Sequence, residues 1–102
     1  MNILLACSAG MSTSLLVTKM KEAAKNEGID AKIWAVSVDN IKTELDKVDV
    51  ILLGPQIRFR LKEVEKSVAD RDIPVTVIDM VAYGSMNGEK VVKQALNAIK
   101  GN

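Results

Sequence analysis

Residues 3–16, with the sequence ILLACSAGMSTSLL, decide the fold. They begin with a short apolar run, Ile3 to Ala6, which is typical of a strand buried on both faces of a sheet. Small and hydroxylated residues follow, and apolar residues then recur at helical spacing over residues 12–27. This order of strand, short loop and helix predicts an α/β protein with the first strand near the middle of its sheet.

The same alternation continues to the end of the chain. Further strands are predicted at residues 30–36, 48–53 and 74–78, and further helices after Asp39, over residues 57–70 and from Asn87 or Gly88. In the first helix, Leu15 and Val17 should widen the apolar stripe of Leu16 and Met20, and Gly28 should end the helix. Asp39 should cap the second helix.

Four strands separated by helices predict a single domain, residues 1–102, with a parallel sheet and helices on both faces. The first and third strands are the most apolar, and the second carries Lys32, so the expected strand order is 2-1-3-4. Ligands of such sheets bind at the switch point, beyond the carboxyl ends of the two central strands. The loops at residues 7–14 and 54–56 should meet there.

The composition of the chain excludes several kinds of functional site. The chain of 102 residues has one cysteine, no histidine and a net charge of +1. These counts exclude an internal disulfide, histidine-ligated metals and Ser-His-Asp triads, and they give no general positive field for nucleic acid. No metal and no cofactor is expected. No signal sequence or membrane span is evident, so a cytoplasmic protein is expected, with the monomer as the default state.

The loop after the first strand has the character of an anion site. Its small and hydroxylated residues let successive N–H groups point inward, and it leads into a helix N-terminus that carries about half a positive charge. A thiolate is favoured in such a field, and the same donors would hold a phosphate on sulfur. The hypothesis is therefore a nucleophilic Cys7 that becomes phosphocysteine. The alternative is a small buried cysteine in a tight turn.

Two further interpretations stay open on the residues alone. Low-molecular-weight tyrosine phosphatases have a similar sheet and place C-x5-R-[ST] after the first strand. Counted from Cys7, Thr13 stands at the arginine position, and Ser14 matches the final hydroxyl residue. Without arginine a phosphocysteine would turn over slowly, which favours a carrier over a phosphatase. Asp79 could serve as an acid or as a helix cap. A non-catalytic phosphate-binding or regulatory module is the third interpretation.

The sequence from Ile3 to Leu16 resembles the active-site segment of IIB components of the bacterial phosphoenolpyruvate-dependent sugar phosphotransferase system, in its lactose/cellobiose/chitobiose group. The resemblance continues through residues 50–56 (VILLGPQ), 74–75 and 79–84 (DMVAYG) to 87–88, and so covers nearly the whole chain.

The resemblance implies a relay in which phosphohistidine of a IIA partner donates to Cys7. Cys7 then donates to a sugar held by a membrane-embedded IIC transporter. The sugar implied is a β-linked disaccharide such as cellobiose, chitobiose or lactose. The residues implied in the phosphate loop are Ser8, Ala9, Gly10, Met11, Ser12, Thr13 and Ser14. Gln56 and Tyr83 are implied as possible neighbours of the site.

Four other residues are candidates for a part in this site or beside it. Met11 either belongs to an apolar docking rim or is simply a loop residue. Arg58 and Arg60 are expected to be solvated helix residues rather than ligands of phosphate or of an acidic partner. Trp34 is expected to pack on the edge strand rather than to take part in recognition.

Overall fold

The computed structural model describes residues 1–8 and 11–101, and it leaves the side chains of Met11 and Ser12 outside the described part. Four strands alternate with α-helices and with 3₁₀-helices, which are labelled η. The elements in chain order are β1 (Asn2–Cys7), α1 (Met11–Asn26), β2 (Lys32–Ser37), η1 (Val38–Lys47), β3 (Val50–Leu53), η2 (Pro55–Arg60), α2 (Leu61–Ser67), η3 (Ala69–Arg71), β4 (Val75–Val77), α3 (Met80–Gly84) and α4 (Gly88–Lys100).

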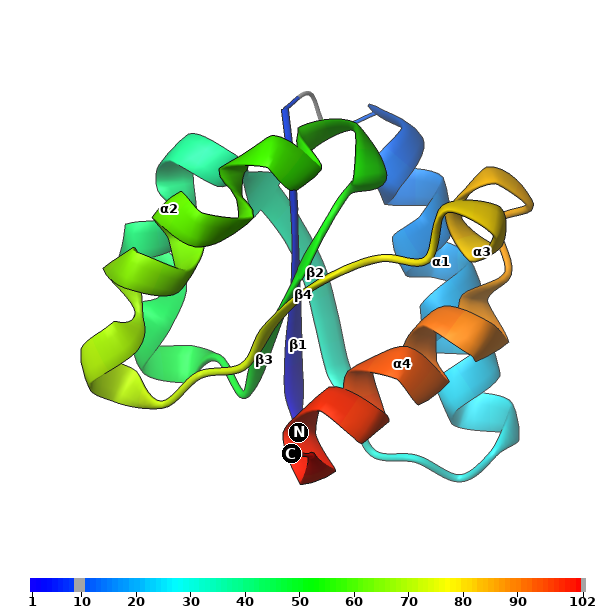
Figure 1. Ribbon diagram of the computed structural model, residues 1–102. Coiled ribbons are helices and arrows are strands. Elements are labelled where there is room, and N and C mark those ends of the chain that lie inside the picture. Colours follow the sequence, from blue (N-terminus) through cyan, green and yellow to red (C-terminus); the bar gives the residue numbers. More distant parts are fainter. Residues whose placement is uncertain (9–10, 102) are drawn as a thin grey trace.

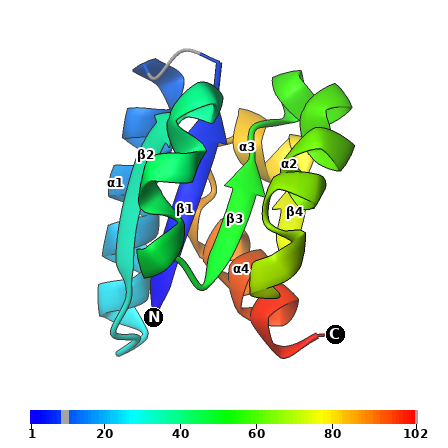
Figure 2. The same cartoon turned by 90° about the vertical axis from the view of Figure 1, so that its left-hand side faces the viewer.

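The strands form one parallel sheet in the order β2-β1-β3-β4, which confirms the predicted topology (Figure 2). β1 lies between β2 and β3, and its last residue, Cys7, is in register with Ser37 at the end of β2. Its Ala6 is in register with Leu53 at the end of β3. The carboxyl ends of the two central strands therefore lie side by side.

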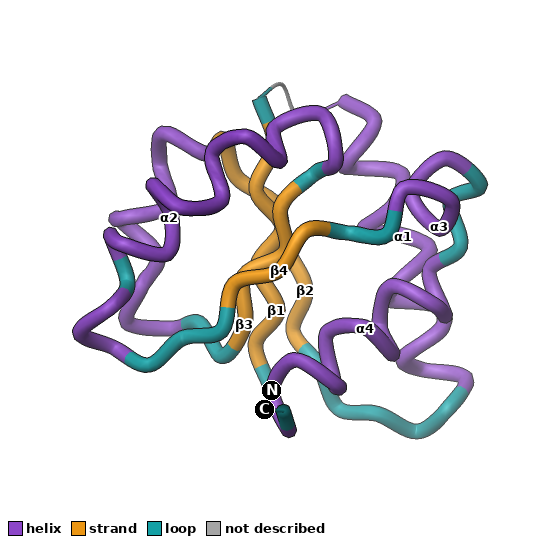
Figure 3. Tube along the Cα trace, viewed as in Figure 1, coloured by secondary structure: helices purple, strands orange, loops and turns teal. Residues whose placement is uncertain are grey.

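Helices cover both faces of the sheet (Figures 1 and 3). Side chains of a strand alternate between faces, so Ile3 and Leu5 pack on one side of β1 and Leu4 and Ala6 on the other. The first side, here called the α1–α4 face, is covered by α1, α3 and α4. The second, the η1–α2 face, is covered by η1, η2 and α2.

The end of α1 agrees with the sequence prediction. Gly28 has φ +69°, its N–H donates to the Lys25 carbonyl oxygen, and the Ile29 N–H donates to that of Ala24. These two bonds make a Schellman motif, in which the left-handed conformation favours glycine. The predicted stripe is correct for Val17, which is buried, but wrong for Leu15, which is 51% exposed. Leu15 lies beside the helix face that meets the sheet.

The segment from Pro55 to Arg71 differs from the single helix that the apolar spacing predicts. It is divided into η2, α2 and η3, and Ile57 has non-helical angles of φ −118° and ψ 25°. Ile57, Val64 and Val68 nevertheless all reach the core of the η1–α2 face. A spacing of three and four residues fits 3₁₀ turns as well as α turns, so periodicity alone does not separate them.

The bounds of several other helices and strands also differ from the predicted ones. The helix predicted after Asp39 is η1, and its cap is Ser37, whose Oγ accepts a hydrogen bond from the Asp39 N–H at 3.4 Å. β2, β3 and β4 occupy Lys32–Ser37, Val50–Leu53 and Val75–Val77. The five-residue helix α3 was not predicted, because it is too short to show an apolar period.

The two long helices of the α1–α4 face approach each other to backbone contact. A Cβ on Gly88, the first residue of α4, would lie 2.4 Å from the carbonyl carbon and oxygen of Lys19 in α1. No side chain fits at this crossing, so glycine is required there for steric reasons.

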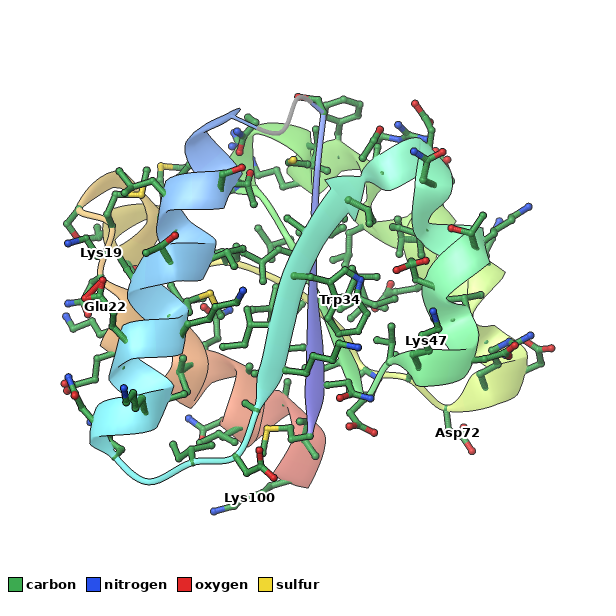
Figure 4. The ribbon with its side chains drawn as sticks, turned by 180° about the vertical axis from the view of Figure 1, so that it is seen from behind. Lys19, Glu22, Trp34, Lys47, Asp72 and Lys100 are labelled. Atoms are coloured by element: carbon green, nitrogen blue, oxygen red, sulfur yellow. The ribbon has the colours of Figure 1, made fainter. Side chains whose placement is uncertain are left out.

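Trp34 lies between β2 and η1 (Figure 4), where its indole N–H donates to Glu44 Oε1 at 2.7 Å. The ring packs against the core of the η1–α2 face, as expected for a packing residue. Both chain termini lie at the amino-terminal end of the sheet, opposite the end of β1 (Figure 1). Among residues 1–8 and 11–101, no helix is both long and apolar enough to cross a membrane.

Candidate functional site

Cys7 ends β1 and is fully buried. It follows Ile3 and Leu5 at the strand period of two, so its side chain lies on the α1–α4 face. Its Sγ is 3.9 Å from the Val36 carbonyl oxygen, to which the thiol donates. The next residue, Ser8, is exposed. The chain thus passes from the interior to the surface between these two residues.

The first turn of α1 covers this end of the sheet. Thr13 is 1% exposed and precedes Leu16, Val17 and Met20 on the buried stripe of α1, so it faces the sheet near the end of β1. Its Oγ1 has no hydrogen-bond partner within residues 1–8 and 11–101. A buried hydroxyl normally has a partner, and leaving one without a partner costs about 1–3 kcal/mol. Among the described residues, the Thr13 hydroxyl is therefore available to donate to a further group.

The remaining loop predictions can be followed only in part. Ser14 is exposed, and its carbonyl oxygen accepts from Thr18 Oγ1 at 3.2 Å. The positions predicted for Ala9 and Gly10, and for the side chains of Met11 and Ser12, lie outside the described part of the chain.

The loop after β3 contacts the carboxyl end of β1, which carries Cys7. The Gly54 N–H donates to the Ala6 carbonyl oxygen at 2.9 Å, which ties this loop to the residue before Cys7. A Cβ on Gly54 would lie 2.6 Å from Gln56 Oε1 and 3.7 Å from the Ala6 oxygen. The absence of a side chain at Gly54 therefore lets Gln56 fold back over the ends of β1 and β3.

Gln56 also reaches a third element. Its Nε2 donates to the hydroxyl oxygen of Tyr83 in α3 at 3.1 Å. The structure thus brings together the two residues that the sequence names as neighbours of the site. They come from segments after β3 and after β4.

The Asp79 carboxylate caps the amino-terminal end of α3. Its Oδ2 accepts from the Ala82 N–H at 2.9 Å, at the start of α3. Of the two roles that the sequence leaves open for Asp79, the structure shows the cap.

Arg58 and Arg60 form hydrogen bonds and ion pairs with nearby residues of the chain. Arg58 Nη1 donates to the Pro55 carbonyl oxygen at 3.2 Å. Arg60 Nη2 lies 2.7 Å from Glu63 Oε2 and 3.2 Å from Asp39 Oδ1. The hydrogen bond from Arg60 lowers the pKa of the Glu63 carboxyl. Arg60 is therefore a link between η1, η2 and α2 rather than a simply solvated residue.

Exposed apolar side chains occur on the elements that follow the strands, and sequence reasoning did not predict these residues; the prediction for the Met11 side chain lies outside the described residues. They are Leu15 in α1, Phe59 in η2, and Met80 and Val81 in α3, with exposed fractions of 51%, 80%, 60% and 72%. We call these four residues the apolar rim. The exposure of Leu15 could have been predicted from the sequence, because Leu15 lies beside the buried stripe of the helix and not on it.

Two cavities open elsewhere on the surface. One of about 680 Å³ lies between η1 and α2, with Ile41 and Val64 in its wall and Lys42 and Lys66 at its margin. The other, of about 540 Å³, lies along β4 and α4. Across the described ranges, no group of three or more His, Cys, Asp or Glu side chains is arranged to hold a metal ion.

Comparison with known proteins agrees with this architecture. The family model "PTS system, Lactose/Cellobiose specific IIB subunit" matches residues 2–94. The oligo-beta-mannoside-specific EIIB component of Bacillus subtilis is 54% identical over 95 residues, covering 93% of this chain and 92% of that protein. The cellobiose-specific EIIB component of Lactococcus lactis subsp. lactis is 48% identical over 100 residues, covering 93% of each chain.

A solved structure shows the same relationship. The cellobiose-specific phosphotransferase IIB component of Borrelia burgdorferi superposes with a TM-score of 0.81 at 45% identity, covering 98% of this chain and 92% of that one. EIIB components are sugar phosphotransferases. The chain therefore belongs to the lactose/cellobiose-specific IIB family of the sugar phosphotransferase system.

Proposed function

We propose that this chain is a phosphoryl carrier in which Cys7 accepts a phosphoryl group from phosphohistidine of a IIA partner and passes it to a sugar bound by a IIC transporter. The observation that carries the proposal is the placement of Cys7 at the carboxyl end of β1 and of the buried Thr13 hydroxyl in the first turn of α1. Within the part of the chain that the structure describes, that hydroxyl has no hydrogen-bond partner.

A phosphoryl group on sulfur would supply the missing partner. Phosphate oxygens accept strong hydrogen bonds, and the backbone N–H groups of the first turn of a helix have no partners within the helix. Thr13 Oγ1 would donate to one phosphoryl oxygen, and amides of residues 8–14 to the others. Ser8, Ser12 and Ser14 are the further hydroxyl groups proposed for this loop, with Ala9, Gly10 and Met11 contributing backbone.

Two displacements at phosphorus complete the relay. In the first, the Cys7 thiolate attacks phosphorus, an S–P bond forms, and the N–P bond breaks with its electron pair returning to the imidazole of the partner. In the second, a sugar hydroxyl attacks, an O–P bond forms and its proton is released, and the S–P bond breaks to restore the thiolate. Thr13 stands where a phosphatase of similar fold has arginine, so hydrolysis of the intermediate is not promoted.

The burial of Cys7 adds a requirement. A thiol with no exposed surface cannot meet a phosphohistidine, so Sγ must turn away from the Val36 carbonyl oxygen before transfer. Rotation about χ1 between staggered positions moves Sγ without moving the strand. The exposed Ser8 marks the side toward which Sγ would turn.

The apolar rim is proposed as the docking surface for both partners. A carrier must bind the donor and then the acceptor at the same sulfur, so both must cover the same end of the sheet. Exposed apolar residues provide contact area without demanding a particular charge pattern, and a flexible methionine such as Met80 can repack against either partner. Gln56 and Tyr83 would lie beneath the docked partner.

A β-linked disaccharide such as cellobiose or chitobiose is the proposed sugar class. Two relatives support this class by their names, oligo-beta-mannoside-specific and cellobiose-specific, whereas a third, also 48% identical, is named galactose-specific. Transfer to a sugar entering through a IIC transporter would take place on the cytoplasmic side of the membrane.

Intact-mass measurement after mixing the chain with a phosphorylated IIA partner tests the carrier role. We expect a gain of one phosphoryl group in the native chain and none in Cys7→Ser. No gain in the native chain would refute the proposal, and so would an equal gain in Cys7→Ser.

Thr13→Val tests the anion loop separately. Valine keeps the shape of threonine but removes the hydroxyl, so the free chain should be as stable or about 1 kcal/mol more stable, because a buried group without a partner is lost. The rate of phosphoryl transfer should fall about tenfold, which corresponds to the loss of one hydrogen bond to a charged group. Thr18→Val provides a control with the same change of side chain at an exposed position of α1 outside the loop. A Thr13→Val variant that is less stable and transfers at the native rate would contradict the role assigned to Thr13.

A further inference from the structure

The sheet has a free edge at β4, which is paired to β3 on one side only. In a parallel ladder, alternate residues direct their N–H and C=O groups to opposite sides. The Ile78 N–H donates to the Leu53 carbonyl oxygen in β3, so Val77 and Asp79 direct their backbone groups away from β3, to the free edge. Such unpaired groups are a template on which another strand can pair.

A side chain from α4 occupies these groups. Gln94 Nε2 donates to the Val77 carbonyl oxygen at 2.6 Å, and Gln94 Oε1 accepts from the Asp79 N–H at 2.9 Å. The Gln94 amide also donates to Thr76 Oγ1 at 3.3 Å. In a parallel ladder, a residue of the neighbouring strand donates to the carbonyl of residue i and accepts from the N–H of residue i+2. Gln94 makes this same pair of bonds.

We propose that Gln94 is a positioning residue that stands in for a fifth strand at the edge of β4 and thereby holds α3, with its Tyr83, over the end of the sheet. Asp79, whose N–H Gln94 fixes, caps α3 through its carboxylate, and its carbonyl oxygen accepts from the Tyr83 N–H at 2.9 Å. Tyr83 in turn meets Gln56. The chain of contacts runs from α4 through the edge of β4 to the site, and its importance for catalysis rests on the proposed function.

The same contact occupies two of the backbone groups through which a second copy of the chain could pair with β4. The cavity beside β4 is lined by Val77, Asp79, Lys90 and Lys93 as well as Gln94, so removing the Gln94 amide would join an open strand edge to an existing groove. The two lysines would oppose self-association without satisfying the backbone groups. The bonds of the Val77 carbonyl oxygen and of the Asp79 N–H at this edge therefore depend on Gln94.

Gln94→Leu and Asn97→Leu form a matched pair for testing the proposal. Both place leucine on the same side of α4, but Asn97 is exposed and makes no side-chain bond to β4 within residues 1–8 and 11–101. Tyr83 is the only tyrosine in the sequence, so its ring signals in a nuclear magnetic resonance spectrum have one source.

We expect Gln94→Leu to speed hydrogen exchange of the Asp79 amide at least tenfold and to shift the Tyr83 ring signals and the Gln56 side-chain amide. Asn97→Leu should do neither. Gln94→Glu keeps the acceptor for the Asp79 N–H but loses the donor to Val77, so its Tyr83 signals should lie closer to those of the native chain. Unchanged Asp79 exchange and Tyr83 signals in Gln94→Leu, or equal changes in Asn97→Leu, would overturn the proposal.

The rate of phosphoryl transfer from a phosphorylated IIA partner is the second readout. It should fall several-fold in Gln94→Leu and stay native in Asn97→Leu, with the fold intact by circular dichroism. A native rate in Gln94→Leu would overturn the positioning role. Absence of transfer in the native chain would refute the proposed function instead, and the resonance and exchange measurements would still decide the role of Gln94.

Discussion

The α1–α4 face and the η1–α2 face of the sheet bury similar aliphatic side chains, but they are constructed differently. On the α1–α4 face, helices of 16 and 13 residues approach to backbone contact at Gly88. On the η1–α2 face, a seven-residue α-helix and 3₁₀ segments leave a groove of about 680 Å³ between η1 and α2. Arg60 links these short segments by ion pairs to Asp39 and Glu63.

This difference matters because the alternation along β1 places Cys7, and the spacing along α1 places Thr13, on the α1–α4 face. A nucleophile and an anion-binding group, the roles proposed for Cys7 and Thr13, must keep a fixed geometry, and a closely packed face would provide it. The looser face carries no residue proposed for the phosphate loop. Substitutions on the two faces should therefore lower the free energy of unfolding by different amounts.

The largest effect is expected at the helix crossing. Gly88→Ala places a methyl group 2.4 Å from backbone atoms of Lys19, so α1 and α4 must separate, and we expect a loss of about 3 kcal/mol in the free energy of unfolding. Gly84→Ala is the control, because a Cβ at this glycine meets no heavy atom within 4 Å among the described residues. It should be neutral or stabilise by up to about 1 kcal/mol. Urea unfolding measures both, and equal effects would show that the crossing is not tightly packed.

Truncating one valine on each face compares their packing directly. Val91, at 0% exposure in α4, belongs to the core of the α1–α4 face, whereas Val64, at 3% in α2, borders the groove. We expect Val91→Ala to cost about 2 kcal/mol and Val64→Ala about 1 kcal/mol, because water can fill the space left beside the groove. If urea unfolding shows a larger loss of unfolding free energy for Val64→Ala than for Val91→Ala, the η1–α2 face is the more tightly packed one and the comparison is wrong.

The smallest effect is expected from Arg60→Gln, because its partners are exposed and solvent screens their interaction. The bond from Arg60 lowers the pKa of Glu63 in the folded chain, so its stabilisation is present above the unfolded pKa of about 4.3 and is lost as the pH falls through the folded value. The difference in unfolding midpoint between the variant and the native chain should therefore narrow on acidification from neutral pH to about pH 3. A difference independent of pH would exclude this ion pair as its cause.

Much of the architecture could be predicted from local sequence signals. Continuous apolar runs distinguished the central strands from the edge strand with Lys32, and this gave the strand order. Gly28 and Asn87 marked the end of α1 and the start of α4, since each acts through backbone groups only a few residues away. The loop with Cys7 was located because it follows a strand and precedes a helix.

What could not be predicted depends on contacts between distant segments. Gln94 looks like any polar residue of an amphipathic helix until β4 lies beside it, 17 residues earlier in the chain. The 3₁₀ turns of η1 and η2 follow from packing on the sheet, because the apolar spacing fits either helix type. The unpartnered state of Thr13 Oγ1, which holds for the described residues, could not be read from its residue type.

The placement of the chain termini has a practical consequence for measurement. Both lie at the amino-terminal end of the sheet, away from the end of β1 that carries Cys7 (Figure 1). A fluorophore or surface tether attached at either end would leave the apolar rim and the carboxyl end of β1 uncovered. Immobilised chains could then be presented in a uniform orientation, so that binding of the proposed donor and of the proposed acceptor can be timed on the same molecule.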